Sequence, residues 1–327
     1  MAAVRILSID GGGIRGVIPA VILSEVERRA GRPIHELFDL VVGTSTGGLI
    51  ALALTAPTSG GGARPASELV DLYEREGSRI FERSLWKRLT SVGGLLDERY
   101  SSAGLEDVLD RYVGDTKLSA ALTPVMVTSY DLHARTAFFF RSSKAVDEPE
   151  YDFPMKVAAR ATSAAPTYFE PVRVQGLASD RESTYALVDG GVFANNPAMC
   201  GFVEASCSHP GADRFVVLSL GTGEQTRTIA YDDAKDWGLV EWARPMLNVV
   251  FDGVSDTVDF QLAQLLSSHV SVYPGSDYLR LQTELTIGND DMDDASATNL
   301  TALKIIAGEI VTGRSAEIDR LIGVLAP

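Results

Sequence analysis

Short, largely apolar runs alternate with amphipathic segments from the start of the chain. Residues 4–9 and 39–42 are typical of buried strands, and in residues 17–30 and 49–54 the apolar positions recur with helical spacing. Pro19 falls in the first turn of the first helix and Gly31 follows its last residue, where these residue types are usual. Because strands that alternate with helices form parallel sheets, the pattern predicts an α/β fold with helices on both faces of a mainly parallel sheet.

The same alternation continues to the end of the chain. The pattern predicts further strands at 124–129, 137–140, 186–188 and 215–220, and helices near 66–81, 102–112, 155–161, 197–207, 255–268, 297–310 and 315–325. The glycine-rich segment 57–65 is a loop signal too early in the chain to separate two domains. We therefore predict a single domain over residues 1–327.

Composition and charge narrow the classes of function. The chain is 45% hydrophobic and 22% charged, and it has no apolar run of the length that a membrane span needs. Its net charge is −15, which excludes the basic surface of a nucleic-acid binder. The acidic excess is concentrated in the C-terminal half: residues 1–160 carry 19 basic and 21 acidic side chains, and residues 161–327 carry 10 and 23. The first residues lack a signal-peptide pattern, so we expect a cytoplasmic protein.

The segment Gly43-Thr44-Ser45-Thr46-Gly47 matches G-x-S-x-G and connects a predicted strand to a predicted helix. A turn tight enough to lift a serine hydroxyl clear of a sheet needs small flanking residues. The serine also falls at a helix N-terminus, where free N–H groups favour developing negative charge. A plain helix cap is the alternative, but the position after the second strand favours a nucleophile elbow at Ser45.

A glycine-rich loop follows the first predicted strand. Gly11, Gly13 and Gly16 formally satisfy the dinucleotide fingerprint G-x-G-x-x-G. A nucleotide site also needs an acidic residue at the end of the second strand, but Asp39 precedes that strand. We favour an oxyanion hole, in which consecutive glycines direct backbone N–H groups at one point.

A serine nucleophile needs a base, and none of the four histidines lies in a motif; they are His35, His133, His209 and His269. The better candidate is Asp189, which ends an apolar run and is followed by Gly190 and Gly191. Partial burial would raise the pKa of this carboxyl toward the working pH. A turn built on Asp-Gly, or a triad of Ser45, Asp189 and a later histidine, stays an alternative at this point.

Together, these segments resemble the patatin-like phospholipase family. Residues 10–16 are similar to its oxyanion motif, residues 43–47 to its nucleophile elbow and residues 189–191 to its aspartate motif. The resemblance extends over roughly residues 4–312, through the segments 161–169, 219–223, 278–281 and 292–296, the last two being similar to plant patatins. An excess of arginine over lysine, 23 to 6, suggests a bacterial member.

The resemblance implies a three-layer α/β/α fold related to cytosolic phospholipases, and lipid acyl hydrolysis without a metal or cofactor. It implies that Ser45 attacks the acyl carbonyl, that Asp189 is the base, and that the amides of Gly12 and Gly13 hold the oxyanion. Gly11 and Arg15 would shape the loop. Transfer of the acyl group to an alcohol or thiol is an alternative outcome, as is a vestigial site. The substrate class also implies peripheral contact with a membrane.

Three other features have two interpretations each. Arg15 could hold a phosphate headgroup or fix the loop through a salt bridge. The acidic run 290–294 is expected to be a solvated turn before a helix, because it lacks calcium-loop spacing. The apolar stretch from Trp237 to Leu247 is expected to pack in the core, with a lid or acyl-chain wall as the alternative. Cys200 and Cys207 lie two helical turns apart, too far for a disulfide.

Overall fold

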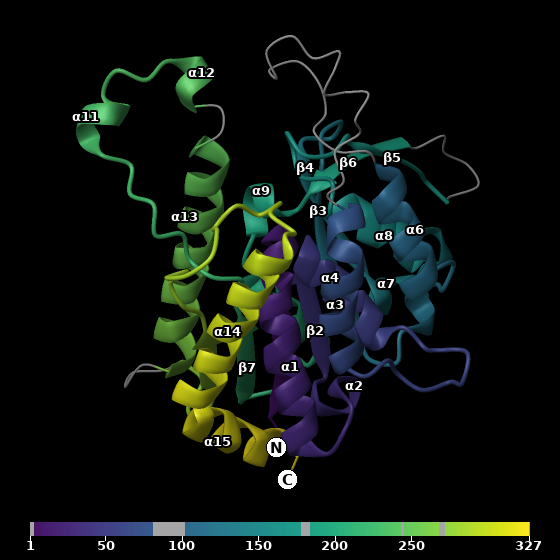
Figure 1. The fold of residues 1–327 in the computed structure, drawn as a ribbon. Helices are drawn as coiled ribbons and strands as arrows, with labels where there is room; N and C mark the ends of the chain where they lie inside the picture. The colour runs from purple at the N-terminus through teal and green to yellow at the C-terminus, as the bar shows by residue number, and fades with distance from the viewer. Residues whose placement is uncertain (1–2, 81–101, 178–183, 243–244, 268–271, 327) are drawn as a thin grey trace.

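The computed structural model describes residues 3–80, 102–177, 184–242, 245–267 and 272–326, and Figure 1 shows their arrangement. Within these residues eight strands form one sheet in the order β5-β6-β3-β2-β1-β7-β8, with β4 paired to β3 outside this order. The strands are β1 (Val4–Ile9), β2 (Leu40–Thr44), β3 (Val125–Asp131), β4 (Thr136–Arg141), β5 (Val172–Gln175), β6 (Thr184–Asp189), β7 (Phe215–Leu220) and β8 (Asp277–Leu281).

The sheet is parallel at its centre and antiparallel at one side. Strand β1 pairs in parallel with β2 and β7, β2 with β3, and β7 with β8. The pairs β3–β4, β3–β6 and β5–β6 are antiparallel. The prediction of a mainly parallel sheet is therefore confirmed, but the strand that ends in Asp189 runs against β3. Only four residues separate β3 from β4, too few for the crossover that a parallel partner requires.

Helices cover both faces of the sheet, which gives three layers. On β1, the side chains of Leu7 and Ile9 join one core cluster and those of Val4 and Ile6 join another, because successive strand residues point to opposite faces. The first core is completed by α1 (Val17–Ala30), α3 (Thr46–Thr55), α4 (Ser67–Ile80), α6 (Ser102–Tyr112), α8 (Met155–Thr162), α14 (Ala297–Gly313) and α15 (Ser315–Leu325). The second is completed by α10 (Ala198–Ser208) and α13 (Pro245–Leu262).

Shorter helices connect these layers. They are η1 (Gly13–Gly16), α2 (Ile34–Leu37), η2 (Leu118–Ala120), α7 (Ser142–Asp147), η3 (Pro149–Tyr151), α9 (Gly191–Ala194), α11 (Tyr231–Ala234), α12 (Leu239–Trp242) and the π-helical turn η4 (Ala263–Ser267). Figure 1 shows α11 and α12 on an excursion beyond the end of α13, away from the sheet. No helix among the described residues is long and apolar enough to cross a bilayer.

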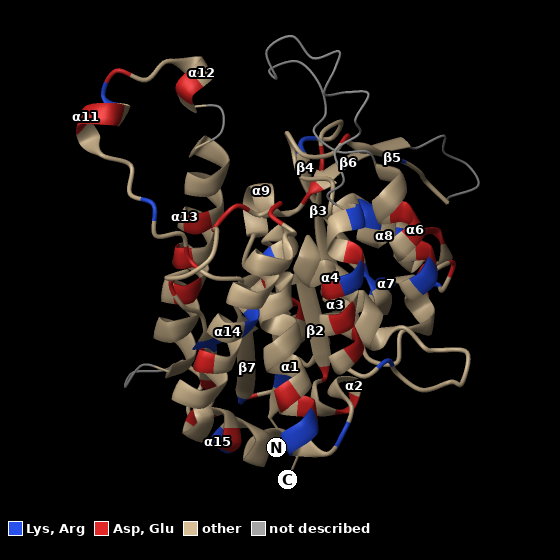
Figure 2. Cartoon of the chain, in the orientation of Figure 1, with Lys and Arg blue, Asp and Glu red and all other residues tan. Residues whose placement is uncertain are grey.

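The excursion corrects one expectation. The described residues between Trp237 and Leu247, all but 243–244, do not pack in the core: Leu239 is 92% exposed, and Val240 and Met246 are also exposed. The two indole rings of Trp237 and Trp242 instead pack edge to face on each other, with 5.1 Å between their centroids. Figure 2 shows acidic residues on α11, α12 and α13, so part of the acidic excess of the C-terminal half lies on this side.

Candidate active site

Ser45 lies in the sharp turn between β2 and α3. Its φ of 54° is in the left-handed region, which a residue with a side chain seldom adopts and which is typical of a strained nucleophile elbow. The backbone N–H of Ser45 donates to Thr162 Oγ1 at 2.8 Å, which fixes the turn to the end of α8. A Cβ at Gly47 would lie 2.1 Å from the carbonyl oxygen of Ile9, so only glycine lets α3 begin this close to β1.

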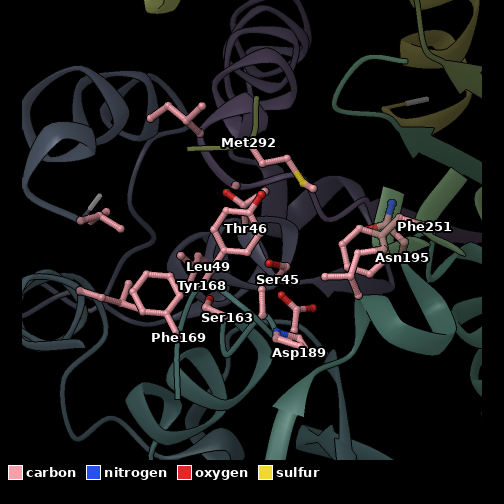
Figure 3. Close-up of a pocket in the computed structure, with 18 of the residues that line it drawn as sticks. Ser45, Thr46, Leu49, Ser163, Tyr168, Phe169, Asp189, Asn195, Phe251 and Met292 are labelled. Carbon is pink, nitrogen blue, oxygen red and sulfur yellow. The ribbon is translucent and has the colours of Figure 1, made fainter. Parts of the chain in front are cut away.

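Strand pairing brings Asp189 to Ser45. Strands β2 and β6 both pair with β3. The last paired residue of β2 is Thr44, opposite Thr128, and the last paired residue of β6 is Asp189, opposite Ser129. Strand β4 occupies the other edge of β3 throughout, so β2 and β6 must share an edge and meet end to end. Both strands run toward the junction, because β2 is parallel and β6 antiparallel to β3. Their carboxyl ends therefore converge, which places the two residues beside each other (Figure 3).

Asp189 is a buried carboxylate, 2% exposed, whose side chain lies beside that of Ser45 (Figure 3). Asp189 Oδ1 accepts a hydrogen bond from the N–H of Gly191 at 2.7 Å. Burial raises the pKa of Asp189 to about 7, and the interactions of its carboxylate with the Ser45 hydroxyl and the Gly191 N–H oppose this rise only in part. A carboxyl with such a pKa is suited to take and return a proton near neutral pH.

The glycine loop leads from β1 into η1 beside the elbow. The N–H of Gly11 donates to Asn195 O at 3.0 Å and that of Ile14 to Met292 O at 2.9 Å. Within the described residues, the intervening amides of Gly12 and Gly13 have no hydrogen-bond acceptor. Gly13 has a φ of 60°, and a Cβ there would lie 2.2 Å from Met292 O. Two N–H groups beside Ser45 are thus available to an external acceptor.

Arg15 fixes this loop without a salt bridge. Its buried guanidinium donates to the carbonyls of Gly12 at 3.4 Å and Gly223 at 3.2 Å. Among the described residues no carboxylate forms an ion pair with it, and burial lowers the pKa of Arg15. Of the two interpretations of Arg15, the loop-fixing salt bridge is corrected to hydrogen bonds with backbone carbonyls, and contact with a phosphate headgroup stays a prediction.

A buried ion pair holds the start of the loop. Arg280 on β8 donates to both oxygens of Asp10, at 2.9 and 2.6 Å, and to Ser219 Oγ at 2.9 Å. Asp10 is 1% exposed, and the contact joins residues 270 positions apart. This ion pair connects Asp10, the last residue before the glycines, to the edge strand β8.

The side chains of Ser45 and Asp189 line a pocket whose walls are mainly apolar. Figure 3 shows Tyr168 and Phe169 on one side of Ser45, and Asn195 and Phe251 on the other. The wall also includes Gly12, Gly13, Ile14, Thr46, Leu49, Leu72, Tyr73, Ile80, Leu105, Ser163, Ala165, Pro166, Leu247 and Met292. Such a cavity can hold a hydrocarbon chain with its polar end at the serine.

None of the histidines in the described part of the chain lines this pocket. His35 lies on α2 before β2 starts, at the opposite end of the strand from Ser45. His133 lies in the turn after β3, and His209 follows α10 with its Nδ1 at 3.1 Å from Ala205 O. His269 lies outside the described residues. Searched over the described residues, no group of three or more histidine, cysteine or acidic side chains is placed to bind a metal.

Three residues that support the site were not predicted individually: Thr162, Asn195 and Arg280 act through contacts with distant segments. Thr162 and Arg280 lie in the segments 161–169 and 278–281 that share the family resemblance, but their residue types alone indicate no role. Met292 corrects an expectation, because the run 290–294 is not simply a solvated turn: its backbone binds the glycine loop, and Met292 is 9% exposed. Asp290 in the same run is 6% exposed and pairs with Arg227 at 2.6 Å.

Comparison with known proteins gives a consistent result. A family model described as Patatin-like phospholipase matches residues 7–199. Patatin-like protein 2 of Arabidopsis thaliana is 34% identical, over 97% of this chain and 84% of its own length. Patatin-like protein 4 of the same plant is 32% identical, over 94% and 83%. Probable inactive patatin-3-Kuras 1 of Solanum tuberosum is 30% identical, over 97% and 88%.

Two solved structures overlap more loosely with the chain. Human GIVD cytosolic phospholipase A2 has 12% identity and a TM-score of 0.49, over 99% of this chain and 60% of that chain. VipD from Legionella pneumophila has 12% identity and a TM-score of 0.37, over 93% and 67%.

Proposed function

The chain belongs to the patatin-like phospholipase family, and we propose that it hydrolyses acyl esters of lipids through Ser45 and Asp189, without a metal. The observation that carries the proposal is the placement of a strained serine beside a buried carboxylate at the wall of an apolar pocket. We also propose that residues 1–327 act as one catalytic domain in the cytoplasm, with the core over about 4–312. The single sheet of the described residues, which takes strands from Val4 to Leu281, supports the single domain.

The proposed reaction has two halves. As Ser45 Oγ bonds to the acyl carbon, Asp189 takes the hydroxyl proton, and the electron pair of the carbonyl moves onto its oxygen. The amides of Gly12 and Gly13 donate to that oxyanion. Collapse of the intermediate breaks the ester C–O bond, and the leaving alcohol takes the proton from Asp189. In the second half Asp189 deprotonates a water, which attacks the acyl-serine; the fatty acid leaves and Ser45 regains its proton.

The test is covalent labelling by a fluorophosphonate, followed by intact mass, beside hydrolysis of a short-chain chromogenic ester. We expect one adduct on the wild type and none on Ser45→Ala. Asp189→Asn should slow both labelling and turnover by about 10²–10⁴-fold, the usual contribution of a general base. Ser143→Ala and Asp147→Asn, both exposed on α7, are the matched controls and should behave as wild type. Labelling that persists in Ser45→Ala would contradict the proposal.

Three alternatives have distinct readouts. Acyl transfer would convert part of the ester to a new ester or thioester when an alcohol or thiol is added, with less free fatty acid. A vestigial site would leave a folded but unlabelled protein, and one 30% identical relative is described as probably inactive. A dinucleotide site at Gly11–Gly16 would give a binding signal in calorimetry. The apolar wall beside that loop favours an acyl chain over a nucleotide.

We further propose that the protein contacts lipid surfaces through the α12–α13 face, defined as the exposed side chains of Leu239, Val240, Met246, Val249 and Val250. The same helix α13 contributes Leu247 and Phe251 to the pocket wall. One helix thus carries both part of the pocket wall and part of the exposed apolar face. The neighbouring acidic residues favour a surface of electrically neutral lipids over an anionic one.

A further inference from the structure

The turn between α8 and β5 provides a continuous part of the pocket wall. Ser163, Ala165, Pro166, Tyr168 and Phe169 all line the pocket. A short segment that forms so much of a binding wall can change the shape of the cavity by a small backbone movement. Its geometry therefore matters for whatever chain the pocket receives.

Thr167, at the centre of this turn, adopts a strained conformation. Its φ is 72°, in the left-handed region that β-branched residues seldom occupy. Among the described residues, the other positive-φ positions with a side chain are Ser45 and Arg135. Strain of this kind persists only where the surroundings hold it, and it is concentrated at functional sites.

Contacts on both sides hold the turn in place. The N–H groups of Tyr168 and Phe169 both donate to Ala165 O at 3.0 Å, which closes the turn tightly. The guanidinium of Arg160 lies 5.8 Å from the centroid of the Phe169 ring and forms an ion pair with Glu106 at 3.5 Å. The ring is thereby held against the pocket.

The turn is also connected to the dyad. Ala164 O accepts from the N–H of Asp189 at 3.0 Å, and Thr162 Oγ1 accepts from the N–H of Ser45 at 2.8 Å. The wall contributed by Tyr168 and Phe169 is thus held at a fixed position relative to the reacting atoms. The distance from the ester carbon to this wall therefore limits the length of acyl chain that fits.

We propose that the turn 163–169 selects substrates by acyl-chain length, with Thr167 setting the direction in which Tyr168 and Phe169 face the pocket. The proposal deepens the proposed function and rests on it. The ligand is the hydrocarbon chain of a fatty acyl ester. The two rings limit the chain, and the left-handed residue between Pro166 and Tyr168 keeps them facing the cavity.

The experiment compares kcat/KM for chromogenic esters of eight to sixteen carbons. Tyr168→Ala and Phe169→Ala should raise the ratio of sixteen-carbon to eight-carbon ester by about tenfold or more, the usual discrimination of an apolar pocket. Thr167→Gly, which can relax to other conformations, should broaden the profile. Thr167→Asn, which tolerates positive φ, should keep it. Phe202→Ala is the matched control: Phe202 is 6% exposed, against 7% for Phe169, but lies in the other core.

A second measurement separates this proposal from the proposed function. Binding of free fatty acids of the same lengths is measured for each turn variant on a Ser45→Ala background, which needs no turnover. If the wild type hydrolyses no ester, the proposed function fails, and the binding profile still tests the turn. Two results would overturn the proposal. One is an equal loss of kcat/KM at all chain lengths in the turn variants, and the other is a fatty-acid binding profile unchanged in Tyr168→Ala and Phe169→Ala.

Discussion

At the scale of single residues, the pKa of Asp189 determines the pH range of activity that the proposed dyad predicts. The carboxyl must be ionised to accept the Ser45 proton, and burial raises its pKa to about 7. We expect kcat/KM for a chromogenic ester to rise about tenfold per pH unit below this value and to level off above it. The rate of fluorophosphonate labelling should follow the same curve, because it uses the same proton transfer. A profile that is flat from pH 5.5 to 8 would exclude Asp189 as the base.

The same residue should lower the stability of the fold at high pH. Because folding raises the pKa of Asp189 from 3.8 to about 7, the folded state loses stability as the pH rises between these values. Asp189→Asn removes the buried charge and keeps the acceptor for the Gly191 N–H. We expect it to stabilise the protein by about 2–4 kcal/mol at pH 8, at about 1.4 kcal/mol per pKa unit, with much less gain at pH 4.

Denaturant unfolding at the two pH values measures this difference. Asp147→Asn, which replaces an exposed carboxylate, is the control and should change stability little at either pH. A gain that is the same at pH 4 and pH 8 would mean that the charge of Asp189 is not its cause. A stable but inactive Asp189→Asn would show that catalysis is maintained at the expense of stability.

At the scale of elements, the contact between β8 and the end of β1 should support both the fold and the glycine loop. Arg280→Leu leaves Asp10 buried without a counter-charge, which typically costs about 3–5 kcal/mol. We expect this loss in denaturant unfolding, together with a lower kcat. Replacing both partners by Asp10→Asn and Arg280→Leu should recover part of the stability. Arg320→Leu removes an exposed pair with Asp277 at 3.3 Å and should cost under about 1 kcal/mol.

Elements with a complete periodic pattern could be predicted from the sequence, and those that depend on their neighbours could not. The bounds of β1, β7, α1, α6 and α15 agree with the predicted ranges to the residue. Strands β5 and β8 were missed: β5 has four residues, of which only Val174 is buried. Helix α13 begins at Pro245, ten residues before the predicted start, because its exposed first turns lack an amphipathic pattern.

The candidate site shows the same division. Strand-to-loop transitions with glycines identify the segments of Ser45 and Asp189 from local sequence alone. The direction of β6 does not follow from local sequence, since it depends on pairing with β3 across 56 residues or more. The supports of the site, such as Arg280 and Thr162, depend on tertiary contacts in the same way. The catalytic roles of the segments stay predictions until the labelling test.

At the scale of the whole molecule, the proposed role of the α12–α13 face predicts that its exposed apolar side chains are needed for binding to lipid vesicles. Val240→Glu and Leu239→Glu should each reduce sedimentation with phosphatidylcholine vesicles by about tenfold, since burying such a side chain typically gains 1.5–3 kcal/mol. Val146→Glu on α7 is the control, because Val146 is 65% exposed and Val240 64%. With a net charge of −15, adding anionic lipid should weaken the binding of the wild type.

The turnover of a soluble ester by these variants separates lipid binding from catalysis. It should stay at the wild-type level, because the five side chains of the face lie outside the pocket wall. Vesicle binding that is unchanged in Val240→Glu and Leu239→Glu would contradict the lipid assignment. A wild-type dimer in analytical ultracentrifugation that dissociates in these variants would assign the face to a second copy of the chain instead.

Because β2 and β6 meet end to end along β3, their pairing with β3 sets the distance between Ser45 and Asp189. Thr128 and Ser129 are consecutive, so the two catalytic strands stop one residue apart on the same edge. In the proposed reaction this spacing places Ser45 next to Asp189, so that the proton passes directly from the serine to the carboxylate. A register slip of two residues in either pairing would keep each buried face buried. It would nevertheless shift one strand end by about 7 Å, which either separates the two ends or makes them overlap. Activity should therefore report on the register of this sheet more sensitively than stability does.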